Sequence, residues 1–178
     1  TGQGFAKSMK FDCTTADASL DSDNFAIIHT RLEGQNLQSL KKGTSSAEST
    51  TLSFWVKSNK TGTYIAELFD TENNRVICKS YTISSSDTWE KKTITFPGDT
   101  TGTFSNDNSG RLRIHFWLLT GTDFSSGSLA TDWESRNNVD RAVGQVNLGD
   151  NTSNEWYITG IQFEVGDTAT DFEHLPHD

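Results

Sequence analysis

Two segments of the sequence alternate between apolar and polar side chains along their whole length. In residues 51–57 the apolar side chains occupy every second position, and residues 111–119 repeat this pattern. A period of two residues is typical of a β-strand that turns one face towards a core. The opposite faces are not simply polar, because Trp55 and Trp117 lie on them among charged groups. The pattern therefore predicts sheets with one buried face and a second face that presents aromatic rings.

Further strands are expected at regular intervals. Alternation and flanking turn residues predict strands at residues 8–13, 25–32, 50–57, 63–70, 75–83, 89–96, 111–119 and 155–165, with a short edge strand at 170–174. Residues 34–43 have room for one helical turn capped by Gly43. Roughly eight to ten strands at this spacing indicate an all-β fold and favour a jelly-roll β-sandwich of two antiparallel sheets.

The length of 178 residues is that of one domain. No internal repeat divides it, so we expect a single jelly-roll domain over residues 1–178 that is a fragment of a longer chain. Two long loops interrupt the strands, at residues 98–110 and 121–154. Loops of this length are usually functional or mobile. The second is rich in apolar residues, which predicts that it packs against the body of the domain.

Charge limits the classes of partner. The net charge is −9, whereas nonspecific nucleic-acid binding needs a basic face, so we expect neither nucleic acid nor an anionic membrane surface as partner. No apolar run approaches the roughly 18 residues of a transmembrane helix, so no membrane insertion is expected. Neutral glycans, cations and other proteins remain as ligand classes.

The two cysteines, Cys13 and Cys78, are too few for a disulfide framework. Two structural thiols within strands are the favoured interpretation. The alternative is one disulfide between neighbouring strands.

No catalytic motif is present. The chain has neither a Gly-x-Ser-x-Gly elbow nor a His-Glu-x-x-His zinc motif, so we expect no enzyme and no cofactor. The acidic loop residues are best explained as solvated carboxylates. The alternative is a structural calcium ion, which takes oxygen ligands from loops. Asp12, Asp167 and Asp171 are its candidate ligands, because the first and last strands of a jelly roll often meet.

The second faces of the two alternating strands provide a candidate ligand surface. Aromatic faces beside polar groups suit sugar rings, which have an apolar face and a rim of hydroxyl groups. The candidate residues are Trp55, Lys57, Arg113, His115, Trp117 and Trp133. Two alternatives stay open for Trp55 and Trp117, namely burial beneath the loop at 121–154 or against another subunit. Trp133, within that loop, is either its anchor or an exposed contact.

The chain resembles a domain that is common in virion structural proteins of marine bacteriophages. The resemblance lies in residues 1–17, 52–58, 87–97, 141–148 and 156–174. Its most specific part is the ending, with Glu-Val-Gly at 164–166, Thr-Ala-Thr at 168–170 and Phe-Glu-His at 172–174. Members of that family usually begin earlier and continue further than this chain does.

The resemblance implies a noncatalytic tail-fibre, spike or head-fibre component of the virion, with a jelly roll similar to carbohydrate-binding modules. Such proteins are usually homotrimers beside other virion proteins. The leading hypothesis is therefore an appendage domain that binds a host-surface glycan or receptor, with weak single sites combined through several copies. The alternatives are a carbohydrate-binding module of a polysaccharide-active enzyme and a purely structural capsid or tail decoration domain.

Overall fold

The computed structural model describes residues 3–174 and is built almost entirely from β-strands. Within these residues the strands are β1 (Met9–Asp12), β2 (Phe25–Glu33), β3 (Thr50–Ser58), β4 (Gly62–Asp70), β5 (Arg75–Ile83), β6 (Glu90–Phe96), β7 (Gly110–Thr120), β8 (Glu134–Ser135) and β9 (Glu155–Val165). Four short 3-10 helices lie between them: η1 (Gly34–Leu40), η2 (Thr122–Phe124), η3 (Asn138–Asp140) and η4 (Leu148–Asp150). None of the described helices is long and apolar enough to cross a membrane.

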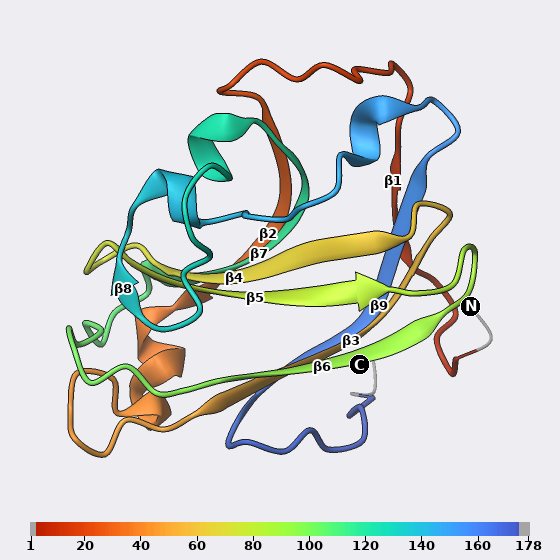
Figure 1. Cartoon of the computed structure of the whole chain (residues 1–178). Helices are drawn as coiled ribbons and strands as arrows, with labels where there is room; N and C mark the ends of the chain where they lie inside the picture. The colour runs from red at the N-terminus through yellow and green to blue at the C-terminus, as the bar shows by residue number, and fades with distance from the viewer. Residues whose placement is uncertain (1–2, 175–178) are drawn as a thin grey trace.

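The strands form two antiparallel sheets packed face to face (Figure 1). One sheet has the order β1-β9-β3-β6, and the other has the order β2-β7-β4-β5-β8. Leaving aside the two-residue β8 and the hairpin of β4 and β5, which are neighbours in the five-stranded sheet, consecutive strands alternate between the sheets in the manner of a jelly roll. The predicted jelly-roll sandwich is therefore confirmed.

The alternating strands meet across the core as expected. The apolar side chains of β3 face those of β7, and Phe54 packs edge-on against Phe116 with ring centroids 5.0 Å apart. Trp156 of β9 adds a third buried ring, 6.1 Å from that of Phe116. All three side chains are at most 2% exposed. Burial of one face of each sheet explains the two-residue period of the sequence.

Some expected elements differ. Residues 170–174 form no strand, because side chains of β9 occupy their backbone groups: Thr170 N–H donates to Glu164 Oε2 at 3.2 Å, and Glu173 N–H donates to Gln162 Oε1 at 3.0 Å. The helical turn at 34–43 is the 3-10 helix η1. The left-handed residue that follows it directly is Lys41, with φ 48°, rather than the expected Gly43.

Both cysteines are buried free thiols. Cys13 follows β1 of the four-stranded sheet, whereas Cys78 lies in β5 of the other sheet. The disulfide alternative is thereby excluded in favour of two structural thiols.

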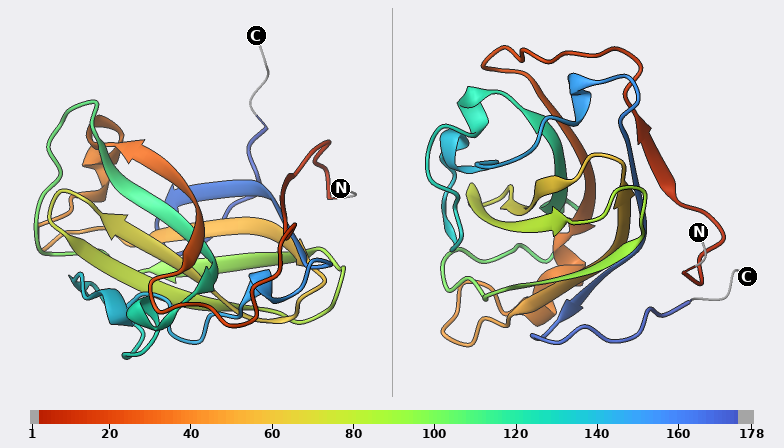
Figure 2. Two further views of the ribbon diagram at one scale, coloured as in Figure 1. Left: turned by 90° about the horizontal axis from the view of Figure 1, so that it is seen from above. Right: turned by 45° about the vertical axis from the view of Figure 1, so that its right-hand side comes forward.

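The segment between β7 and β9 packs along the outside of the five-stranded sheet, as its apolar content predicts (Figures 1 and 2). Its Ala130 and Ala142 are buried in a second apolar cluster with side chains of β4, β5 and β7. Backbone bonding fixes it in place, since Cys78 N–H donates to the Ala130 carbonyl at 2.7 Å. The short strand β8, which pairs with β5, lies within this segment. The outer face of this sheet is therefore covered on its β4–β5 side.

Candidate functional site

A buried carboxylate lies on the outer face of the five-stranded sheet. Glu67 of β4 has no exposed surface. Its oxygens accept hydrogen bonds from Trp117 Nε1 at 2.7 Å, His115 Nδ1 at 3.1 Å, and Arg141 Nε and Nη2 at 2.8 and 3.1 Å. Burial opposes ionisation of this group, but the hydrogen bond with His115 and the charge of Arg141 outweigh it and lower the pKa of Glu67. Through Arg141, Glu67 thus fixes the segment between β7 and β9 (residues 121–154, the covering segment) to the sheet.

The side chains of Trp117 and His115 lie on the outer face of the five-stranded sheet, but both are buried. Trp117 is 0% exposed and His115 is 4% exposed. The ring of Phe124 from the covering segment lies 5.5 Å from that of Trp117, and the Arg141 guanidinium is 5.2 Å from the same ring. This corrects the expectation that both side chains lie on an open outer face of the sheet. For Trp117 the structure instead matches the alternative of burial beneath the 121–154 segment.

A groove of about 450 Å³ remains where the sheet is not covered, above β2 and β7. Register places His29 of β2 opposite His115 and Arg31 opposite Arg113. The covering segment supplies the facing wall. The groove is lined by Phe25, Ile27, His29, Phe69, Arg113, His115, Trp117, Phe124, Arg136, Asn138 and Arg141. It is the largest of the cavities described within residues 3–174.

Aromatic rings line the groove at two places. At its mouth, Phe25 is 54% exposed and packs edge-on against Phe124 with ring centroids 5.1 Å apart. Deeper in, the ring of Phe69 lies within 6 Å of the guanidiniums of Arg113, Arg136 and Arg141, at 5.8, 5.3 and 5.4 Å. Burial, aided by the nearby charges of Arg31 and Arg141, lowers the pKa of the Arg113 guanidinium. The groove thus combines apolar faces with several hydrogen-bond donors.

The predicted ligand residues do not form one site, because their strands belong to different sheets. Trp55 and Lys57 lie on the outer face of the four-stranded sheet, whereas Arg113 is on the opposite side of the sandwich. Trp55 borders a separate cavity of about 250 Å³, where the terminal segments bring Phe5 and Phe172 together. Lys57 lies outside that cavity, 4.4 Å above the ring of Tyr157. Of the six candidates, only Arg113, His115 and Trp117 border the groove.

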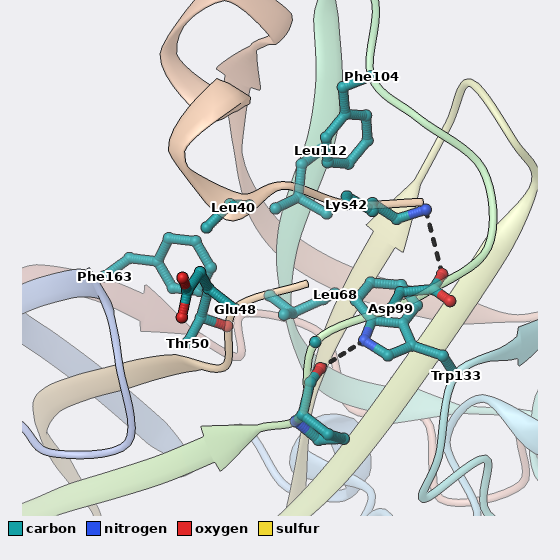
Figure 3. A pocket seen from close by; sticks show the side chains of 12 residues that line it. Leu40, Lys42, Glu48, Thr50, Leu68, Asp99, Phe104, Leu112, Trp133 and Phe163 are labelled. Atoms are coloured by element: carbon teal, nitrogen blue, oxygen red, sulfur yellow. Dashed lines mark hydrogen bonds and ion pairs between the residues drawn. The ribbon is translucent and has the colours of Figure 1, made fainter. Parts of the chain in front are cut away.

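Trp133 lies at a third place, beside a buried cluster of charges at one end of the sandwich (Figure 3). Its indole N–H donates to the Pro97 carbonyl at 2.8 Å, and Lys42 Nζ is 5.5 Å from its ring. Lys42 in turn pairs with Asp70 at 2.6 Å and Asp99 at 3.1 Å. The cavity here has a volume of about 20 Å³, which has room for a single water molecule. These contacts correspond to the loop-anchor alternative for Trp133.

The three candidate calcium ligands are not brought together. β1 does pair with β9, but antiparallel register places Asp12 opposite Glu155 at the start of β9. Asp167 and Asp171 follow the end of β9 at Val165, a strand length of roughly 33 Å away at 3.3 Å per residue. Among the described residues no group of three His, Cys, Asp or Glu side chains is placed to hold a metal ion. The expected ligand set is therefore wrong.

Several lining residues were missed by sequence reasoning. Phe25 and His29 belong to a predicted strand, and the alternation of β2 would have placed His29 on the outer face. Phe124, Arg136 and Arg141 lie in the covering segment, whose irregular backbone has no period from which to predict direction. No sequence signal identifies them.

No protein-family model matches the sequence, and no curated protein matches it significantly. A solved structure described as "CBM4 structure and function" is similar over 84% of this chain, with 12% sequence identity and a TM-score of 0.40. The chain spans 66% of that structure's length, just under two thirds. At this level of similarity no functional property carries over from that protein.

Proposed function

We propose that this chain is a noncatalytic carbohydrate-binding domain whose ligand lies in the groove above β2 and β7. The observation that carries the proposal is the groove itself, about 450 Å³ in volume and lined by aromatic rings beside side-chain donors. Small-molecule sites typically occupy roughly 300–1,000 Å³ and combine apolar walls with a few polar groups. The exposed ring of Phe25 offers a flat apolar surface, and Arg113 and Asn138 offer donors for hydroxyl groups.

The noncatalytic role is supported by the chemistry of the lining residues. Hydrolysis of a glycosidic bond requires two carboxyl groups on either side of that bond. None of the residues that line the groove is Asp or Glu. Glu67 lies beneath the floor, where His115, Trp117 and Arg141 occupy its oxygens.

We further propose that the domain belongs to a bacteriophage virion appendage, such as a tail fibre, spike or head fibre, and binds a host-surface glycan or receptor. Support comes from the sequence resemblance alone. Assembly as a homotrimer would combine three weak sites. Light scattering of the purified protein tests this point, with an expected mass of about three times 19.7 kDa. A monomer would favour the alternative of a carbohydrate-binding module from a polysaccharide-active enzyme.

The binding proposal is tested by screening the protein, presented multivalently, on an array of bacterial-surface and algal glycans. Phe25→Ala is expected to weaken binding by roughly tenfold, the usual size for loss of one aromatic contact. Met9→Ala is a matched control, because Met9 is equally exposed at 53% but belongs to the other sheet. Loss of binding in Trp55→Ala but not in Phe25→Ala would place the site in the cavity of the four-stranded sheet. Absence of all binding would favour the purely structural alternative.

A further inference from the structure

The groove concentrates positive charge in an acidic protein. The chain carries a net charge of −9. The lining of the groove nevertheless includes three arginines and two histidines but no acidic residue. The positive charge of the groove is therefore a local property of this site, because the chain as a whole is negatively charged.

Two of the three arginines that line the groove, Arg113 and Arg136, have no carboxylate partner among the described residues. The chain has six arginines. Three of them have carboxylate partners: Arg75 with Asp99, Arg111 with Asp107, and Arg141 with Glu67. Within residues 3–174 the side chains of the remaining three have neither an ion pair nor a hydrogen bond, and all three lie at or beside the groove: Arg31, Arg113 and Arg136.

The position of Arg113 is costly without a ligand. Its Nε atom is buried and has no hydrogen-bond partner. Register places it directly opposite Arg31, and like charges at opposed strand positions destabilise a sheet. A buried donor on a charged group is also expensive to leave unpaired. An anion in the groove would compensate both costs at once.

We propose that the groove binds an acidic saccharide through a carboxylate or sulfate group held by the guanidiniums of Arg113 and Arg136. This inference rests on the proposed carbohydrate-binding function and adds the chemical class of the ligand. A guanidinium donates two parallel hydrogen bonds to such planar or tetrahedral oxyanions. Phe25 and Phe124 at the mouth provide apolar surface for the sugar ring. Arg141 has a positioning role only, because Glu67 already occupies it.

The test measures binding of the full chain to three polysaccharides by affinity electrophoresis and calorimetry. Polygalacturonate carries carboxylates, carrageenan carries sulfates, and agarose is a neutral galactan. We expect one of the two acidic polymers to bind at least roughly tenfold more tightly than agarose, since charge-assisted hydrogen bonds are the stronger ones. Which acidic polymer binds distinguishes carboxylate from sulfate as the group recognised.

Variants then locate the interaction. Arg136→Gln and Arg113→Gln are each expected to weaken acidic-polymer binding by roughly tenfold. Arg136 is exposed, so its substitution leaves folding intact even if that of Arg113 does not. Arg111→Gln is the matched control, because Arg111 lies two residues from Arg113 on β7 but outside the lining of the groove. Its substitution should leave binding unchanged.

The failures of the two proposals are distinguishable. Equal binding of agarose and the acidic polymers, lost in Phe25→Ala but retained in both groove arginine variants, would overturn the acidic ligand and leave carbohydrate binding standing. An equal loss in Arg111→Gln would show attraction by charge in general and would also overturn the inference. Absence of binding to all three polymers and to the glycan array would overturn both proposals.

Discussion

Substitution of Glu67 by Gln tests the electrostatics beneath the groove. The carboxylate has no exposed surface and accepts hydrogen bonds from His115, Trp117 and Arg141. Glutamine has nearly the same shape, but it removes the negative charge and replaces one acceptor oxygen by a donor amide. The Arg141 side chain, 8% exposed, then carries a buried charge without a partner. Removing one partner of a buried pair costs about 3–5 kcal/mol, a large share of the stability of about 5–15 kcal/mol that is typical of a domain.

Urea denaturation at neutral pH measures this loss as a lower midpoint with an unchanged m-value. The melting temperature should fall by about 6–20 °C, at about 2–4 °C per kcal/mol for a chain of this length. Glu48→Gln makes the same chemical change in the surface pair of Lys41 and Glu48, whose side chains are 55% and 40% exposed. That control should lose less than about 1 kcal/mol.

A loss in Glu67→Gln no larger than that of the control would refute the reasoning, because it would mean that Arg141 does not depend on Glu67. The double variant Glu67→Gln/Arg141→Met provides a second check. It removes the orphaned charge, so its loss of stability should be smaller than the sum of the two single losses by about 0.5–3 kcal/mol. Simple additivity would contradict a coupled pair.

Three further predictions concern pH, metal and the remaining tryptophan. Because the pKa of Glu67 is lowered, its stabilising contribution is complete above the unfolded value of 4.5 and is lost as pH falls through the folded-state pKa. The stability difference between the native protein and Glu67→Gln should therefore shrink in acid, and a difference constant with pH in urea titrations would contradict this. Since Asp12 lies far from Asp167 and Asp171, EDTA should leave the melting temperature unchanged, and a fall of several degrees would indicate a metal site. Trp133→Ala should cost about 2 kcal/mol, below the range for fully buried rings because Trp133 is partly exposed, and should leave glycan binding unchanged in the array assay.

The strands were predictable because the causes of their pattern are local. β5 and β9 have the bounds that alternation predicts, and β3 and β7 extend the predicted segments by one residue at one or both ends. Successive side chains of a strand point to opposite faces, so burial of one face is recorded directly in the sequence. Turn residues at each end of these strands have equally local preferences.

The pairing of strands was not predictable in the same way. Trp55 and Trp117 have the same position within similar alternating segments, yet β3 and β7 lie in different sheets and the two rings face away from each other across the sandwich. The irregular 121–154 segment likewise gives no period from which to infer that Arg141 reaches Glu67 at a distance of 74 residues along the chain.

By itself, the sequence determined an all-β chain, the position of most strands and which side of each strand is buried. Tertiary structure alone decided which outward faces share a surface. It covers Trp117 with the segment that follows β7 and surrounds Glu67 with buried hydrogen-bond donors. Within the described residues it also places two unpaired arginines, Arg113 and Arg136, in one groove of an acidic protein, with Arg31 beside Arg113. The physical reason is that side-chain direction depends on the backbone of one strand, whereas a shared surface depends on the order and register in which distant strands pair.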